Sequence, residues 1–149
     1  NDLAVVSFLM HHSNCLLYHT GGRVLRDNQS CIGDSTTQFL RNLNLDISFL
    51  SASSWNTRWI STPSEGKVAV KEAALAAAAK RVLICDSSKY GKVGIFNAVP
   101  LESLDLVITD DRLPDSARQA VSKSGVRLVI ASAHGAVAVA PENTVENLA

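Results

Sequence analysis

The stretch that decides the fold is residues 81–94, RVLICDSSKYGKVG. Four apolar residues lead directly into a carboxylate, two hydroxyls and a lysine, and glycines follow on either side of a lysine and a valine. Because the apolar run shows no polar alternation, it predicts a strand that is covered on both faces, as in a parallel sheet. The side chains of Asp86, Ser87, Ser88 and Lys89 would then gather where this strand ends.

The same pattern recurs along the chain. Three further apolar runs predict strands, namely DISFLSAS (46–53), LDLVITDD (104–111) and VRLVIA (126–131). A fourth run, NCLLYHTGG (14–22), predicts a strand that ends at a glycine pair.

Helix candidates separate these strands, over residues 1–12, 34–43, 62–80 and 114–123. The third carries several helix signals at once. Thr62 and Glu65 have the spacing of a capping box, Pro63 stands where a helix tolerates proline, and an alanine-rich run of high helix propensity follows. Alternating strands and helices with buried strands predict an α/β fold, with a mostly parallel sheet and helices on both faces. Ligands of such sheets bind beyond the carboxyl ends of the strands.

Composition narrows the class of protein. The 149 residues suffice for one domain with a sizeable core, and 46% hydrophobic residues are typical of a globular chain. Lysine plus arginine and aspartate plus glutamate number 14 each, so no net positive charge attracts nucleic acid or an anionic membrane. The three cysteines are widely spaced without a CxxC pair, which predicts free thiols and a cytoplasmic location. The histidines have no metal-ligand spacing, and no apolar run is long enough to span a bilayer.

The residues that follow the predicted strand 81–85 are the first site candidate. Backbone amides, the hydroxyls of Ser87 and Ser88, and the Lys89 ammonium are the groups that bind an oxyanion such as phosphate. The alternative is a solvated turn in which Asp86 caps the next segment, and the pattern by itself does not separate the two hypotheses.

Other strand ends offer weaker candidates. Gly21-Gly22 would let the backbone approach a ligand, although a glycine pair is also an ordinary turn. Asp110 and Asp111 follow a strand and are more simply interpreted as caps of the next helix. Lys71 lies on the alanine-rich helix and could pair with an anion. The loop between Trp55 and Trp59 predicts a lid, a subunit contact, or two rings that cover the sheet edge.

Taken in order, these pieces resemble the C-terminal effector-binding domain of DeoR-family bacterial transcriptional regulators. CDSSKYGKVG (85–94) is similar to the family's Asp-Ser-Ser-Lys-Phe-Gly segment, and LDLVITDD is similar to its Ile-Thr-Asp strand. Asn1 resembles the asparagine of the family's Thr-Asn motif. The glycine pair and the helix that contains Val70-Lys71 also match, and the matches run through about Ala131.

The resemblance implies a fold similar to that of ribose-5-phosphate isomerase, glucosamine-6-phosphate deaminase and the CoA transferases. It implies an effector-binding domain over residues 1–140 and a polar tail over 141–149. The family's first strand, its phosphate loop and its helix-turn-helix domain would precede Asn1, so we expect an N-terminally truncated domain. By the same resemblance a sugar-phosphate site, with neither cofactor nor metal, would be lined by Lys89, Lys71, Asn1, Gly21 and Gly22, and supported by Ser88 and Asp86.

Two departures from the family pattern concern the sugar. Lys67 stands four residues before Lys71, where relatives often carry glutamate, and SSWNT replaces a small glycine-bearing turn after the strand that ends at Leu50. The related isomerases place acidic residues after that strand, whereas this chain has Ser-Ala-Ser-Ser at 51–54. Without a general base there, binding is favoured over catalysis, and Glu65 is the residual base candidate.

The sequence therefore predicts a ligand-sensing domain of a transcriptional regulator, most simply a repressor. The expected partners are a phosphorylated sugar, DNA through the helix-turn-helix domain, and further copies of the chain. The alternatives are a sugar-phosphate isomerase-like enzyme and an oligomerisation domain with a vestigial pocket.

Overall fold

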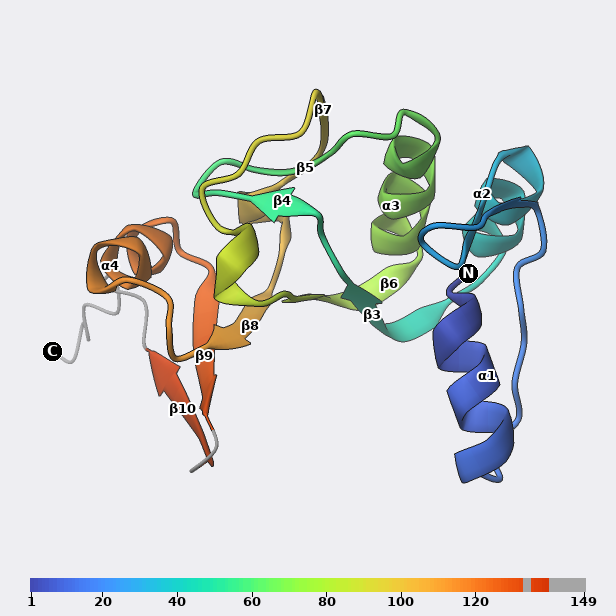
Figure 1. Ribbon diagram of the computed structural model, residues 1–149, viewed down its shortest axis with the longest axis horizontal. Coiled ribbons are helices and arrows are strands. Elements are labelled where there is room, and N and C mark those ends of the chain that lie inside the picture. Colours follow the sequence, from blue (N-terminus) through green and yellow to red (C-terminus); the bar gives the residue numbers. More distant parts are fainter. Residues whose placement is uncertain (133–134, 140–149) are drawn as a thin grey trace, which may run out of the picture.

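The computed structural model describes residues 1–132 and 135–139, and it shows a mixed α/β architecture (Figure 1). The helices are α1 (Leu3–His12), α2 (Asp34–Arg41), α3 (Gly66–Ala76) and α4 (Asp115–Lys123), with the 3-10 helices η1 (Ser87–Lys89) and η2 (Leu101–Ser103). The strands are β1 (Arg23–Leu25), β2 (Ser30–Ile32), β3 (Leu45–Leu50), β4 (Ser54–Trp55), β5 (Trp59–Thr62), β6 (Ala78–Ile84), β7 (Phe96–Pro100), β8 (Leu106–Asp110), β9 (Arg127–Ser132) and β10 (Gly135–Val139).

The larger sheet has the strand order β10-β9-β8-β6-β3. The four strands β3, β6, β8 and β9 are parallel, and β10 pairs with β9 in the antiparallel sense. The predicted class, α/β with a mostly parallel sheet flanked by helices, is confirmed. Since parallel neighbours end at one edge of a sheet, the residues after β3, β6 and β8 lie along a common edge.

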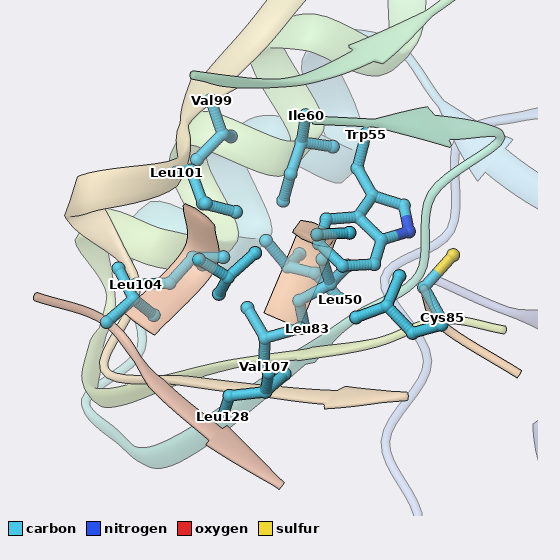
Figure 2. Packing of buried hydrophobic residues seen from close by; sticks show 14 of the residues in the cluster. Leu50, Trp55, Ile60, Leu83, Cys85, Val99, Leu101, Leu104, Val107 and Leu128 are labelled. Carbon is cyan, nitrogen blue, oxygen red and sulfur yellow. The ribbon is translucent and has the colours of Figure 1, made fainter. Parts of the chain in front are cut away.

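One face of this sheet holds the main core (Figure 2). Leu83, Val107 and Leu128 are fully buried on that face, where α3, α4 and the antiparallel sheet β4-β5-β7 pack against it. Trp55 is also fully buried here, which agrees with the alternative in which its ring covers the sheet, while a lid or subunit contact of the loop between Trp55 and Trp59 stays a prediction. Full burial of one aliphatic side chain such as Leu83 contributes about 1.5–3 kcal/mol. Because most of the buried apolar residues belong to this cluster, this face supplies most of the hydrophobic stabilisation.

The opposite face is covered less completely. Ile47 and Phe49 of β3 and Ile84 of β6 point to it, and Phe49 is 62% exposed. The prediction that these strands are covered on both faces is therefore wrong for the described part of β3 and for the end of β6. An apolar run without polar alternation is typical of a strand that is covered on both faces. Whether another element covers the strand depends on the rest of the fold, which the run itself does not show.

Residues 14–22 do not form the predicted strand. Leu16 and Tyr18 are 82% and 76% exposed, so the apolar residues of this run pack against little of the described chain. A strand needs a neighbour for its backbone hydrogen bonds, and the segment pairs with none of the described strands.

The alanine-rich region divides at Ala77, where no helix-stop residue indicates a break. Helix α3 ends at Ala76 and β6 begins at Ala78, whose pairing with Leu45 starts the parallel ladder. The predicted helix through residue 80 is thus too long, because ladder pairing outweighs the modest helix propensity of a few alanines. The capping box is also absent, since Thr62 ends β5 and Glu65 makes no capping hydrogen bond.

The remaining elements are close to expectation. Helices α1, α2 and α4 lie within or at the predicted ranges, and Gly125 follows α4 with a φ of 81° that suits glycine. None of the three cysteines forms a disulfide. Among the described residues, no helix has the length and apolar character needed to cross a membrane. The predicted boundary at 140 and the tail over 141–149 lie outside the described residues.

Candidate functional site

The Lys71 ammonium lies at the carboxyl end of β3. Its Nζ donates a hydrogen bond to the carbonyl oxygen of Ser51, the first residue after that strand. Burial, with a smaller contribution in the same direction from the positive charge of Lys67, lowers the pKa of Lys71 to about 8. The fold therefore holds a cation in a place that disfavours it, while two of its three N–H groups remain for another acceptor.

Cys85, the residue after β6, lies within electrostatic range of this cation. Its thiol is buried and donates to the carbonyl oxygen of Ala52 at 3.3 Å, and burial raises the pKa of the thiol. Lys71 and Lys89 both lie within electrostatic range of the Cys85 sulfur. The two predicted site lysines, Lys71 on α3 and Lys89 in η1, thus both lie within electrostatic range of Cys85.

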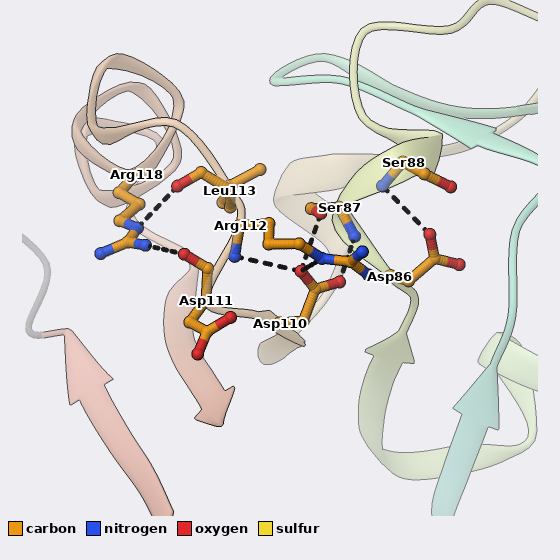
Figure 3. Close-up of polar contacts among 8 residues, drawn as sticks. All are labelled: Asp86, Ser87, Ser88, Asp110, Asp111, Arg112, Leu113 and Arg118. Carbon is orange, nitrogen blue, oxygen red and sulfur yellow. Dashed lines mark hydrogen bonds and ion pairs between the residues drawn. The ribbon is translucent and has the colours of Figure 1, made fainter. Parts of the chain in front are cut away.

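The short helix η1 carries the DSSK segment itself. The Asp86 carboxylate caps η1 by accepting from the Ser88 amide at 3.0 Å (Figure 3). Hydrogen bonds from the Ser88 hydroxyl and amide, with the charge of Lys89, lower the pKa of Asp86. Lys89 is half-buried, and its side-chain ammonium has no hydrogen bond or salt bridge in the described part of the chain. The capping role predicted for Asp86 is confirmed, and Lys89 remains available for an anion.

Asp110, the last residue of β8, links the end of its own strand to the residues that follow β6 (Figure 3). Its carboxylate accepts from the Ser87 amide at 2.7 Å, from the Ser87 hydroxyl at 2.8 Å, and from the amide and Nε of Arg112 at 3.1 Å each. The hydrogen bond from the Ser87 amide is the largest of the causes that hold the pKa of Asp110 far below its usual range.

This arrangement corrects two predictions. Asp110 does not cap α4, whose N-cap residue is Pro114 without a side-chain hydrogen bond. The Ser87 hydroxyl is already committed to Asp110 and so is not a free donor for phosphate. Side chains that leave neighbouring strands can bond to one another across the sheet edge, which spacing along one strand does not reveal.

Asn1 and the glycine pair form a second group around β2 and the start of α2. The Asn1 side-chain amide donates to the carbonyl oxygen of Cys31 at 2.9 Å, and the Gly21 carbonyl accepts from the Thr36 hydroxyl at 2.7 Å. Gly22 has a φ of 106°, and a Cβ built on it would lie 2.2 Å from the Thr36 Oγ1. Only glycine fits there, so packing against Thr36 accounts for this residue without a ligand.

Lys67 connects the two groups. It lies one helical turn before Lys71 on the same face of α3, and it is within electrostatic range of both Lys71 and Asp2. Burial lowers the pKa of Lys67, and the charge of Asp2 opposes that change. Asp2 is itself the N-cap of α1 and accepts from the Val5 amide at 2.9 Å.

Two surface hollows lie near these elements. One of about 210 Å³ is lined by the ends of β6, β8 and β9 and includes Cys85, Asp86 and Asp110. A larger one of about 450 Å³ lies between α2 and α3 and contains none of the predicted site residues. We place the candidate site at the cations because it is charge that decides where a phosphate binds.

The family comparison agrees with this architecture. Residues 1–111 match the model of the DeoR C-terminal sensor domain, which includes both site lysines and Asp110. The chain belongs to the DeoR C-terminal sensor family. The candidate site is thus the strand-end region of a DeoR sensor domain, and the recognition made from CDSSKYGKVG and LDLVITDD is confirmed.

Similar proteins are transcriptional regulators. The sensor domain is 48% identical over 131 residues to the HTH-type transcriptional regulator YgbI of Escherichia coli, covering 88% of this chain and 51% of that protein. It is 42% identical over 130 residues to an HTH-type transcriptional regulator of Haemophilus influenzae, covering 87% and 51%. It is 32% identical over 111 residues to the regulator GlpR of Haloferax volcanii, covering 74% and 44%. The chain spans about half the length of the curated relatives it matches.

Sequence reasoning missed three contributors to the site. Cys85 was considered only as a free thiol, and Asp110 chiefly as a helix cap, yet the Cys85 thiol donates to the Ala52 carbonyl and Asp110 accepts from the Ser87 amide of η1. Ser51 contributes a backbone carbonyl, which no side-chain motif can show. The apolar run that ends at Cys85, directly before Asp86, could have indicated a role for Cys85, because such a residue lies between a buried strand and a polar loop.

Proposed function

We propose that this chain is the ligand-sensing half of a DNA-binding transcriptional regulator of carbohydrate metabolism, and that it binds a phosphorylated sugar. The single observation that carries the proposal is that Lys71 and Lys89 both lie within electrostatic range of Cys85, with no carboxylate salt bridge to either in the described chain. Two cations that form no salt bridge with a carboxylate of the described chain suit a phosphate dianion.

The response follows from linkage. A ligand that binds one arrangement of the domain more tightly than another shifts the population toward it, and only this difference in affinity can change operator binding. Coupling of about 1–3 kcal/mol changes operator affinity roughly 5- to 150-fold, which suffices for a repressor that releases its operator.

Catalysis has less support than binding. The segment 51–54 after β3 holds no carboxylate, and its Ser51 carbonyl is occupied by Lys71. The hydrogen bonds that lower the pKa of Asp86 make it a weak base. Glu65 is exposed and has no side-chain capping bond, so its position does not aim it at a substrate carbon.

The test uses the full-length regulator in an operator-binding titration with phosphorylated sugars. Lys89→Ala should abolish the effector response and leave operator affinity in the absence of effector unchanged. Lys92→Ala, an exposed lysine three residues further along the same loop, is the matched control and should respond normally. If the effector released the Lys89→Ala regulator from its operator at the effector concentrations that act on the wild type, the assignment of the site would be contradicted.

A thermal-shift screen separates the remaining alternatives. Stabilisation by at least one phosphorylated sugar supports the sensor function, because a ligand that binds only the folded state raises its stability. No stabilisation by any sugar phosphate would favour an oligomerisation domain, and turnover of a probe would favour an isomerase-like enzyme.

A further inference from the structure

Lys67 lies where elementary electrostatics disfavours a cation. It stands in the first turn of α3, which contains no acidic residue, and a positive charge there opposes the helix dipole. Lys71 follows at the i+4 position, and like charges at that spacing destabilise a helix by a few tenths of a kcal/mol. Both side chains are half-buried, so water screens their repulsion incompletely.

No salt bridge in the described chain relieves this repulsion. Asp2 is within electrostatic range of Lys67, but its carboxylate caps α1 and forms no ion pair within 4.0 Å. The Ser51 carbonyl is a partner for Lys71 alone. A molecule that brings a negative charge to Lys67 would therefore remove an unfavourable interaction that the unliganded domain retains.

We propose that the ligand carries a second anionic group, a carboxylate, which Lys67 binds while Lys71 and Lys89 hold the phosphate, so that the effector is a phosphorylated sugar acid. This inference rests on the proposed sugar-phosphate function and names the class of ligand. A monoanion suits Lys67 better than a second phosphate does, because the nearby Asp2 charge already offsets part of the Lys67 charge.

The geometry fits a short carbon chain. Lys67 and Lys71 are separated by four residues of helix, a rise of about 6 Å, and a backbone of a few carbon atoms spans that distance. The carboxylate end would then lie at Lys67, near the amino end of α3, and the phosphate end toward Cys85 and Lys89.

The test is a calorimetric titration of the full-length regulator with matched probes. The pairs are 6-phosphogluconate against glucose 6-phosphate, and 4-phosphoerythronate against erythrose 4-phosphate. Within at least one pair the acid should bind about tenfold more tightly than the aldose, the worth of one charged hydrogen bond. Lys67→Gln should abolish that preference without weakening the aldose phosphate, and Lys67→Arg should restore most of it.

Lys80→Gln, an exposed lysine of β6 far from its carboxyl end, is the control and should keep the preference. Equal binding of acid and aldose, or tighter binding of fructose 1,6-bisphosphate than of either acid, would overturn the second carboxylate and leave the proposed function intact. Binding of none of a wide panel of phosphorylated sugars would overturn both. A preference that survives Lys67→Gln would assign the carboxylate to another residue and also contradict the inference.

Discussion

Asp110 and Lys71 are both charged and both lie at the carboxyl edge of the parallel sheet, yet their surroundings are opposite. Asp110 accepts four hydrogen bonds from Ser87 and Arg112, and every one of them stabilises its charged form. Lys71 has one backbone acceptor, a second cation one turn away, and a burial that disfavours its charge.

The difference separates a structural group from a ligand-binding group. A charge that the protein itself satisfies adds to stability, whereas one that the protein desolvates without an opposite charge costs stability until a ligand supplies it. The same edge of the sheet thus contains a rigid support, around Asp110, and an unsatisfied cationic pair, around Lys71. Substitutions should affect stability in the first and ligand affinity in the second.

The largest expected effect is that of Lys71→Met on ligand binding. Removal of one charged hydrogen-bond donor from the proposed phosphate site should weaken effector binding about 100-fold. The free energy of unfolding should change by less than about 1 kcal/mol, because the lost bond to Ser51 is offset by the removal of a desolvated charge. Calorimetric titration and denaturant unfolding measure the two quantities.

Lys80→Met provides the control, since Lys80 is exposed and outside the site. It should change neither quantity. If Lys71→Met lost several kcal/mol of stability and kept its ligand affinity, Lys71 would be a structural residue and the comparison with Asp110 would fail.

Asp110→Asn should show the reverse pattern. The free energy of unfolding should fall by about 2 kcal/mol, because a neutral amide accepts the Ser87 and Arg112 hydrogen bonds more weakly than a carboxylate that is 24% exposed. Effector affinity should fall less than tenfold, since the substitution leaves Lys89, the last residue of η1, unchanged. Asp111→Asn, an exposed neighbour without a side-chain bond, should lose less than about 0.5 kcal/mol.

Acid unfolding gives the sign of the Asp110 contribution. Its folded pKa lies below the ordinary aspartate value, so its stabilisation is fully present above about pH 4 and is lost as the pH falls toward the folded pKa. The Asn variant should lose stability less steeply than the wild type over that range. Parallel acid profiles of the two proteins would show that Asp110 does not carry the charge-dependent stabilisation.

The smallest expected effect is the alkaline weakening of effector binding. Because the pKa of Lys71 is about 8, effector affinity should fall roughly tenfold between pH 7 and pH 9 as Lys71 loses its proton. Over the same range the stability of the unliganded protein should rise, because the unfolded chain, with the higher lysine pKa, binds more protons. Lys71→Met should show neither trend, and a pH-independent wild-type affinity would contradict the proposed role of the charge.

The sequence was informative where a structural feature depends only on residues that are close together in the chain. The run that precedes Asp86 predicted the end of β6 and the cap of η1, because strand burial and an Asx cap are decided within a few residues. The TDD end of β8 and the helix that stops before Gly125 followed in the same way. Among the predicted site residues, Lys71 and Lys89 both lie within electrostatic range of Cys85, and their part in ligand binding stays a prediction.

Partners that are distant in sequence could not be predicted. The start of β6 at Ala78 depends on Leu45, the role of Asp110 depends on Ser87, and the low pKa of Lys71 depends on Lys67 and on burial. The apolar run over residues 14–22 shows the opposite error, since its local pattern favours a strand but no neighbouring strand of the described chain pairs with it.

The sequence by itself determined the four parallel strands β3, β6, β8 and β9, the polar groups at the strand ends and the family resemblance, because these depend on hydrophobic periodicity and on short local motifs. Only the tertiary structure decided which of those groups satisfy one another. Ser87 is bound to Asp110 while Lys67, Lys71 and Lys89 have no carboxylate in a salt bridge within the described chain, because hydrogen bonds and charges at a sheet edge depend on which strands lie side by side.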